Sequence, residues 1–108
     1  VAPVTHWKYY DNIYTERYLQ RPIDNPKGYE DNSPINFTKN LEGRYLIVHG
    51  TGDDNVHFQN TAEMINSLIK SGKNFDSEIY PNRAHGISDK AARVHLFTKL
   101  TNYILENL

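Results

Sequence analysis

The chain has 108 residues, a formal net charge of −1 at neutral pH and no cysteine. Its length fits one domain or part of one, and the lack of cysteine excludes disulfides and thiolate chemistry within it. Lysine and arginine are scattered rather than clustered, which argues against a nucleic-acid-binding surface. No apolar run approaches the roughly 18 residues of a membrane-spanning helix, so we expect no membrane contact from this segment.

The first forty residues predict a short strand, a helix and a loop. The apolar run Val1–Val4 indicates the end of a strand, so we expect the chain to begin inside a fold, which would hide any targeting segment. Residues 20–40 are polar and contain three prolines, which favours a loop with at most one short helical turn. Between them, large side chains recur at the spacing of one helical face, at Trp7, Tyr10, Tyr14 and Tyr18.

This aromatic stripe has two interpretations. A stripe at helical spacing usually packs into the core. Buried tyrosine hydroxyls, however, each need a polar partner. Several such rings in a row therefore fit the wall of an apolar pocket better than a sealed interior.

Two strand candidates, each followed by a helical pattern, occupy the rest of the chain. Residues 44–48 lack polar–apolar alternation, as expected of a strand buried on both faces, and residues 75–80 form the second candidate. Helical spacing follows the first strand at Phe58, Ala62, Ile65 and Ile69. It follows the second, after the candidate caps Ser88 and Asp89, at Val94, Phe97, Leu100 and Ile104. This order predicts an α/β fold with parallel strands and flanking helices.

An acid and a histidine follow the two predicted strands. Asp53 comes after the first and His85 after the second. The carboxyl ends of parallel strands meet at one edge of a sheet, where catalytic groups gather. A carboxylate there would fix the imidazole tautomer and stabilise the imidazolium during proton transfer. The pair therefore predicts two members of a Ser–Asp–His triad, and the alternative is two unrelated surface residues on loops.

Several details around this pair stay open. No Gly-x-Ser-x-Gly elbow occurs in the sequence, so the serine is expected upstream. Asp54 competes with Asp53 for the acid role, or caps the helix that starts near Val56. His49 ends a buried strand and is expected to be a hydrogen-bonded structural residue. A metal site from His49, Asp53 and His57 matches no known zinc spacing, and we expect no metal or other cofactor.

Segments spread over essentially the whole chain carry a family resemblance. They are Val1–Val4, Trp7, Tyr9–Asp11, Tyr14–Tyr18, His49–Thr51, Asp53–Gln59 and His85–Gly86. Together they resemble the dipeptidyl peptidase IV group of the prolyl oligopeptidase family of serine peptidases. The Tyr-Thr-Glu-Arg and Asp-Asp-Asn-Val-His-Phe-Gln segments are the most specific part of the match.

The resemblance implies a serine exopeptidase that releases N-terminal X-Pro or X-Ala dipeptides from peptides. It implies that residues 1–108 are the C-terminal portion of an α/β-hydrolase domain, after the nucleophile elbow. Asp53 matches the catalytic acid of the family, His85 matches the base, and Asn55 matches the residue that holds a substrate carbonyl. The pocket for the proline ring is matched by Val4, Trp7, Tyr10, Tyr14 and Val56.

The departures from the family pattern carry expectations of their own. The chain lacks the serine, the glutamates that grip the substrate amino terminus and the oxyanion-hole tyrosine, so we expect the isolated segment to be inactive. The resemblance further implies a homodimer, and a periplasmic, secreted or membrane-anchored location. The alternatives are an endopeptidase or acylaminoacyl peptidase of the same clan, and a non-catalytic assembly domain.

Overall fold

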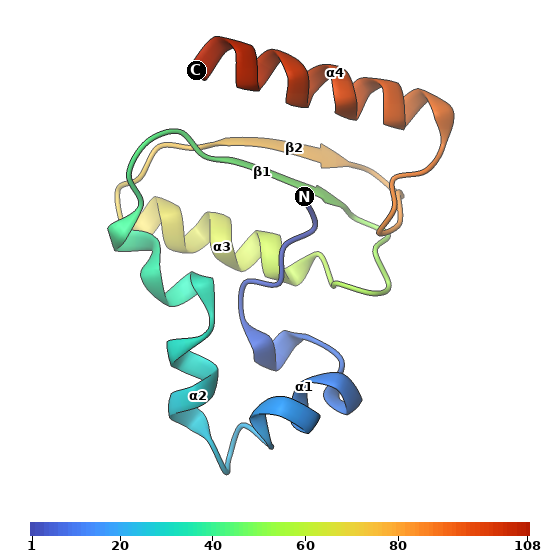
Figure 1. The fold of residues 1–108 in the computed structure, drawn as a ribbon. Helices are drawn as coiled ribbons and strands as arrows, with labels where there is room; N and C mark the ends of the chain where they lie inside the picture. The colour runs from blue at the N-terminus through green and yellow to red at the C-terminus, as the bar shows by residue number, and fades with distance from the viewer.

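The computed structural model describes residues 1–108. Its elements are the 3-10 helix η1 (Trp7–Tyr9), α1 (Asn12–Leu19), α2 (Pro26–Asp31), the 3-10 helix η2 (Pro34–Asn40), β1 (Leu46–Gly50), α3 (Gln59–Lys70), β2 (Asp76–Tyr80) and α4 (Lys90–Asn107). Strands β1 and β2 pair in parallel, with Leu46 opposite Asp76 and Gly50 opposite Tyr80. Helix α3 lies on one face of this sheet and α4 on the other (Figure 1). The predicted α/β fold is confirmed. None of the helices has both the length and the apolar character of a membrane span.

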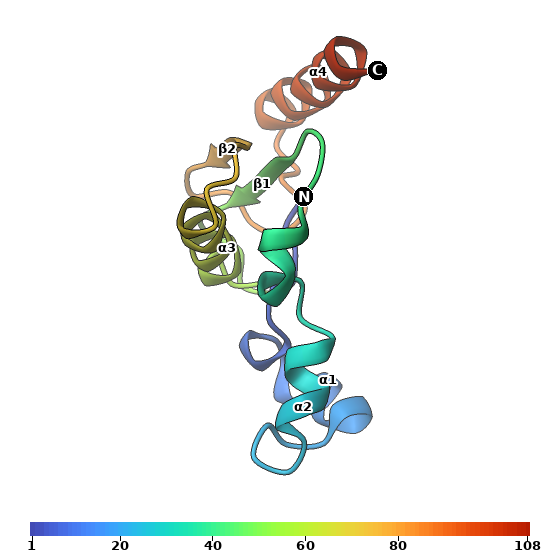
Figure 2. The ribbon, with the colours of Figure 1, turned by 90° about the vertical axis from the view of Figure 1, so that its left-hand side faces the viewer.

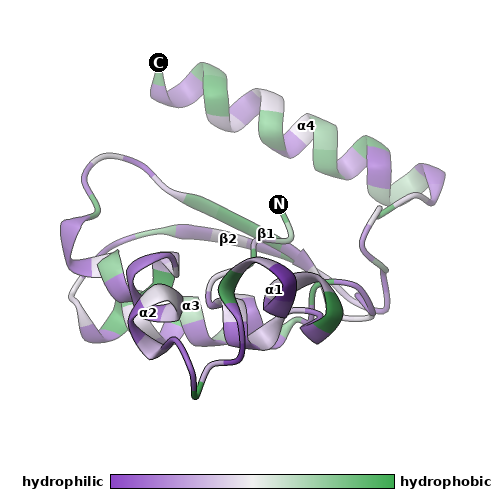
Figure 3. Ribbon diagram, turned by 60° about the horizontal axis from the view of Figure 1, so that its bottom comes forward, coloured by the Kyte–Doolittle hydropathy of each residue, from purple (hydrophilic) through white to green (hydrophobic).

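Each face of the sheet carries its own apolar cluster. Residues Val48 and Tyr80 face α4, and Ile47 faces α3. The α4 cluster contains Val48, Tyr80, Ile87, Ala92 and Leu96. The α3 cluster contains Ile47, Met64 and Leu68. Successive residues of β1 thus point to opposite helices, which explains why this strand is apolar without alternation and hydrophobic along most of its length in Figure 3.

The buried face of α3 differs from the predicted stripe. Its buried residues are Asn60, Thr61, Met64 and Leu68, whereas Ile69 is 62% exposed. The reason is polar: Asn60 bonds to Thr5, and Thr61 bonds to His49 in β1. These two buried contacts turn the helix so that Met64 and Leu68, rather than Ala62 and Ile69, meet the sheet.

The predicted apolar stripe of α4 is only partly a core face, because Leu100 is its one member that packs against the α4 cluster. Ala92 and Leu96 are buried, whereas Val94, Phe97 and Ile104 are each more than half exposed. A sheet of two strands covers only one side of a long helix, so the opposite apolar side has no cover within this chain. The predicted cap is confirmed, because the Asp89 carboxylate accepts a hydrogen bond from the Ala92 amide at 3.2 Å.

The N-terminal segments also differ from the prediction. Val1–Val4 forms no strand, although the Ala2 amide donates to the Val48 carbonyl at 2.7 Å beside β1. Pro3 has no N–H with which to continue a ladder. Residues 6–19 form η1 and α1 instead of one helix, because the Asp11 carboxylate caps α1 by accepting from the Ile13 amide at 2.8 Å.

The predicted loop over residues 20–40 contains α2 and η2. Proline occupies the first turn of both helices, at Pro26 and Pro34. Its fixed φ and missing N–H suit that position. The prolines that indicated a loop in the sequence are therefore helix starts.

Polar contacts at its two ends hold residues 6–32, the N-terminal lobe, in place beside α3. The Thr5 amide donates to Asn60 Oδ1 at 2.9 Å, and the Thr5 hydroxyl donates to the Asn60 carbonyl at 2.7 Å. The Trp7 amide donates to the Ser33 hydroxyl at 3.1 Å. Figure 2 shows the lobe and α4 at opposite ends of the molecule, with the sheet between them. The aromatic residues of the lobe are thus held in a fixed position relative to the start of α3.

Candidate active site

Asp53 lies in the turn that joins β1 to α3, and it is 5% exposed. Its Oδ1 accepts hydrogen bonds from the Asn55 amide at 2.9 Å and from the Val56 amide at 2.8 Å. These backbone donors fix the plane of the carboxylate. Its Oδ2 is left to face two histidine rings, those of His85 and His49.

His85 lies in the loop between β2 and α4. Its Nδ1 lies 2.8 Å from Asp53 Oδ2, and its side chain is 44% exposed. Since a carboxylate can only accept, Nδ1 carries the hydrogen and donates it. Nε2 is therefore the nitrogen left free for proton transfer. The structure brings the predicted acid and base into direct contact at the carboxyl edge of the sheet.

Two opposing effects set the pKa of Asp53. Burial of the side chain raises the pKa, because a carboxylate loses solvation there. The hydrogen bond from His85 and those from the Val56 and Asn55 amides outweigh burial and hold the pKa below its ordinary value. Asp53 is consequently ionised at neutral pH and can stabilise a positive charge on the His85 ring.

The sequence around the His85 loop explains its close approach to β1. A Cβ on Gly50 would lie 2.2 Å from the Arg83 carbonyl oxygen, so only glycine fits at the end of this strand. On the far side of the loop, Ile87 is 1% exposed and packs in the α4 cluster. Its φ of +43° is a strained value for a β-branched residue. The burial of Ile87 in this cluster thus fixes the path of the loop after His85.

The other polar residues near Asp53, at the end of β1 and in the turn after it, fall into two groups. His49 is fully buried with both ring nitrogens hydrogen-bonded, which confirms its predicted structural character. Asp54 and His57 are exposed. The predicted capping role of Asp54 is wrong, because α3 begins after Phe58 with no side-chain cap. No three His, Asp or Glu side chains are grouped to hold a metal ion.

The aromatic residues of the lobe contact one another in series. The Trp7 and Tyr10 ring centroids are 5.9 Å apart, and those of Tyr10 and Tyr14 are 5.6 Å apart, both edge to face. The Tyr10 hydroxyl donates to Asn55 Oδ1 at 3.2 Å. This hydrogen bond links the aromatic residues to the turn that carries Asp53.

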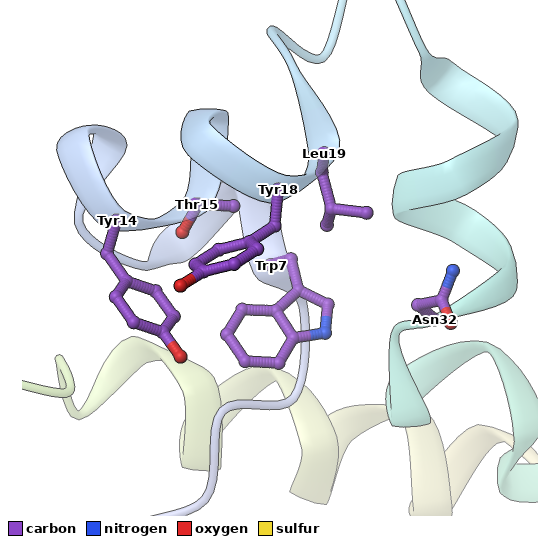
Figure 4. A pocket seen from close by; sticks show the side chains of 6 residues that line it. All are labelled: Trp7, Tyr14, Thr15, Tyr18, Leu19 and Asn32. Atoms are coloured by element: carbon purple, nitrogen blue, oxygen red, sulfur yellow. The ribbon is translucent and has the colours of Figure 1, made fainter.

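The predicted pocket residues do not line one common hollow: two hollows contain some of them, and Val4 and Val56 line neither. The first, of about 230 Å³, is shown in Figure 4 and is lined by Trp7, Tyr14, Thr15, Tyr18, Leu19 and Asn32. The second, of about 610 Å³, includes Tyr10 and Asn55 in its lining. Val56 is buried beside Asn55 in the turn, and Val4 is half-buried before Thr5.

The first hollow contains residues that sequence reasoning did not assign to the site. Tyr18 shares the helical spacing of Tyr14, so the periodicity could have indicated it. Thr15 and Leu19, which precede and follow Tyr18 in the chain, also belong to α1. Asn32 comes from the end of α2, which was predicted as loop, so no signal in the sequence pointed to it.

Comparison with known proteins identifies the family to which the chain belongs. Residues 1–108 match the model of the prolyl oligopeptidase family. The chain is 44% identical over 107 residues to the Neurospora crassa protein named "Probable dipeptidyl-aminopeptidase B", covering 97% of this chain and 12% of that protein. It is 40% identical over 107 residues to dipeptidyl peptidase 4 of Bos taurus, covering 96% of this chain and 14% of that protein.

The fold comparison agrees with the sequence comparison. The crystal structure of Porphyromonas gingivalis dipeptidyl peptidase 4 superposes with a TM-score of 0.96 and 39% identity, covering 99% of this chain and 15% of that chain. The present chain thus spans a small part of the length of its relatives. Since the family match covers every residue, the chain belongs to the prolyl oligopeptidase family.

Proposed function

We propose that this chain is the C-terminal portion of the α/β-hydrolase domain of a serine exopeptidase that releases X-Pro or X-Ala dipeptides. The observation that carries the proposal is the 2.8 Å contact between His85 Nδ1 and the buried Asp53 carboxylate. An ionised, buried acid in contact with a half-exposed imidazole is the arrangement a serine nucleophile requires. The dipeptidyl peptidase names of the relatives support the substrate class.

In the proposed mechanism, His85 is the general base and then the general acid. Its free Nε2 takes the proton of the serine hydroxyl as the oxygen attacks the scissile carbonyl, and later delivers that proton to the leaving amine. Asp53 keeps the hydrogen on Nδ1 and stabilises the imidazolium while the proton is on Nε2. The contact between the two side chains suits this role without any rearrangement.

We assign substrate positioning to the aromatic residues and to Asn55. The edge-to-face rings of Trp7, Tyr10 and Tyr14 offer an apolar surface for a flat proline ring, and Val4 and Val56 would complete it. A charged side chain would lose its solvation against these rings at a high free-energy cost. Because Asn55 Oδ1 accepts from Tyr10, its Nδ2 is free to donate to a substrate carbonyl.

The experiment that tests the proposal uses the full-length protein. It should release the chromogen from a Gly-Pro-chromogen with a free amino terminus and should not cleave the same substrate when that amino group is blocked. Equal cleavage of the blocked substrate would favour the endopeptidase or acylaminoacyl peptidase of the same clan. No cleavage of either would favour a non-catalytic assembly domain. A Gly-x-Ser-x-Gly elbow about 70–80 residues before Asp53 would support the enzyme independently.

We further propose that the full-length protein is a homodimer in which α4 takes part. The supporting observation is the apolar side of this helix, where Val94, Phe97 and Ile104 are each more than half exposed. Apolar side chains grouped on one side of a helix mark an interaction surface. Light scattering should give twice the monomer mass for the full-length protein and a smaller mass for Phe97→Glu. A monomer at high concentration in the wild type would contradict this assignment.

A further inference from the structure

His49 is a fully buried histidine in β1 that the proposed chemistry leaves without a role. Its Nδ1 lies 2.6 Å from the Thr61 hydroxyl in α3. Its Nε2 lies 2.8 Å from the Val56 carbonyl oxygen and 3.3 Å from Asp53 Oδ2. The Phe58 ring packs edge-on against the imidazole, with centroids 5.6 Å apart. The ring is therefore enclosed and bonded at both nitrogens.

The partners of His49 fix where its hydrogen lies. The Val56 carbonyl and the Asp53 carboxylate are both acceptors, so Nε2 must carry a hydrogen. In the neutral ring, Nδ1 then accepts from the hydroxyl of Thr61. The Val56 carbonyl thus sets the tautomer of the ring, and the Thr61 hydroxyl satisfies the nitrogen that this tautomer leaves as an acceptor.

We propose that His49 is a positioning residue for Asp53. Its Nε2–H donates to the Val56 carbonyl and so holds the turn that presents Asp53 and Asn55. The inference deepens the proposed function and rests on it. His49 touches neither substrate nor reacting atoms in that scheme, and acts only through the acid.

The hydrogen bonds around the carboxylate show why a second histidine matters. Oδ1 of Asp53 accepts from two backbone amides, one of them that of Val56, whereas Oδ2 accepts from His85 and lies 3.3 Å from His49 Nε2. Val56 is thus bonded on both sides: its carbonyl accepts from His49 Nε2 at 2.8 Å, and its amide donates to Asp53 Oδ1 at 2.8 Å. Without the His49 hydrogen bond, Val56 can shift, the carboxylate loses the firm position of one of its backbone donors, and the base loses its fixed orientation.

Two pairs of variants in the full-length protein separate the hydrogen bond from the shape of the side chain. His49→Phe fills the site but removes the donor, whereas the amide nitrogen of His49→Gln can reach the position of Nε2. Thr61→Val removes, at nearly constant volume, the hydroxyl that bonds to Nδ1 of the ring, whereas Thr61→Ser keeps it. The second pair carries the test if His49→Phe does not fold, because neither of its members alters the ring.

Two readouts keep the inference distinct from the proposed function. The first is the rate of covalent labelling by a fluorophosphonate, which reports nucleophile activation whatever peptide the enzyme prefers. The second is kcat and KM for a Gly-Pro-chromogen, with the thermal midpoint measured for each variant. Loss of positioning lowers the labelling rate and kcat, and leaves KM nearly unchanged.

We expect His49→Phe and Thr61→Val to lower kcat and the labelling rate by about 10- to 100-fold, the range found when outer-shell partners of metal ligands are removed. His49→Gln and Thr61→Ser should recover most of that loss. Wild-type rates in a folded His49→Phe or Thr61→Val protein would overturn the inference, as would equal losses in both members of a pair. If the wild type is labelled but does not cleave the Gly-Pro-chromogen, the proposed substrate class is wrong. The role of His49 is then decided by the labelling rates of the variants alone. A wild type that is not labelled would overturn the serine peptidase and this inference together.

Discussion

The Tyr10 hydroxyl lies 3.2 Å from the side-chain oxygen of Asn55, although the two residues are 45 positions apart in the chain. This contact joins the N-terminal lobe to the turn after β1. The contact uses the side-chain oxygen of Asn55 and leaves its amide nitrogen free to donate to another group. The proposed pocket and the proposed acid are therefore parts of one hydrogen-bonded arrangement.

Removing the hydroxyl of Tyr10 tests this arrangement. We expect Tyr10→Phe in the full-length protein to raise KM for a Gly-Pro-chromogen about fivefold, the equivalent of one hydrogen bond of about 1 kcal/mol. The value of kcat should change less than twofold, since the contact orients a binding group. Tyr45→Phe is the matched control, because it removes the same atom near the α3 cluster, away from the site. Identical KM values for the two variants would contradict a role for the Tyr10–Asn55 contact.

The approach of the His85 loop to β1 depends on Gly50. In Gly50→Ala the new Cβ would lie 2.2 Å from the Arg83 carbonyl oxygen, so the loop must move. A displacement of about 1 Å at a catalytic group costs up to about 100-fold in rate, and we expect a loss of kcat of that order. Gly86→Ala, in the same loop, places its Cβ 3.9 Å from the nearest atom and should retain most activity. Steady-state kinetics on both variants would decide, and an active Gly50→Ala would refute the geometry.

The lowered pKa of Asp53 predicts how its contribution to stability depends on pH. A carboxyl whose folded pKa is depressed stabilises the protein above its unfolded pKa of about 3.9, and this stabilisation is lost as pH falls through the folded pKa. The thermal midpoint of the full-length wild type should exceed that of Asp53→Asn at pH 6, and the gap should narrow below pH 4. Asp54→Asn controls for the loss of one exposed carboxylate from the same turn. A gap that widened in acid would contradict the hydrogen-bonded carboxylate.

The isolated 108-residue chain should not cleave peptides. Loss of the nucleophile alone lowers the rate by about 10⁶-fold in a comparable triad, and this chain has no elbow serine. The purified segment and the full-length protein should be assayed side by side with a Gly-Pro-chromogen. Measurable turnover by the segment, with contaminating peptidase excluded by a His85→Ala version, would show that another residue supplies the nucleophile.

Much of the sheet and its edge could be predicted from the sequence, because those features are local. A run such as Tyr45–Val48 is apolar at every position, and this pattern alone indicates a strand buried on both faces. Parallel pairing then brings together the residues that follow each strand. The contact between Asp53 and His85 could therefore be predicted from the sequence alone. The cap at Asp89 is equally local, since it depends on one side chain and the amides that follow it.

The features that were predicted wrongly depend on contacts between distant segments. Helix α3 is oriented by Thr5 and His49, which bond to Asn60 and Thr61, and hydrophobic spacing contains no trace of these bonds. The stripe of α4 has the predicted periodicity, but Val94, Phe97 and Ile104 have no packing surface within this chain. The break before α1 arises from the Asp11 cap. This capping signal is present in the sequence, but the regular aromatic spacing favoured one continuous helix instead. Neither the Tyr10–Asn55 contact nor the place of Asn32 in the first hollow follows from periodicity.

The most direct test of the account measures Gly-Pro-chromogen hydrolysis by the full-length protein and by its Asp53→Ala and His85→Ala variants. The account predicts that the wild type cleaves the substrate, and that each variant loses about 10⁴-fold or more in kcat while remaining folded. Asp54→Ala, which alters the exposed neighbouring acid, should keep activity close to that of the wild type. Substantial turnover by a folded His85→Ala or Asp53→Ala protein, or a greater loss in Asp54→Ala than in Asp53→Ala, would contradict the assignment of acid and base.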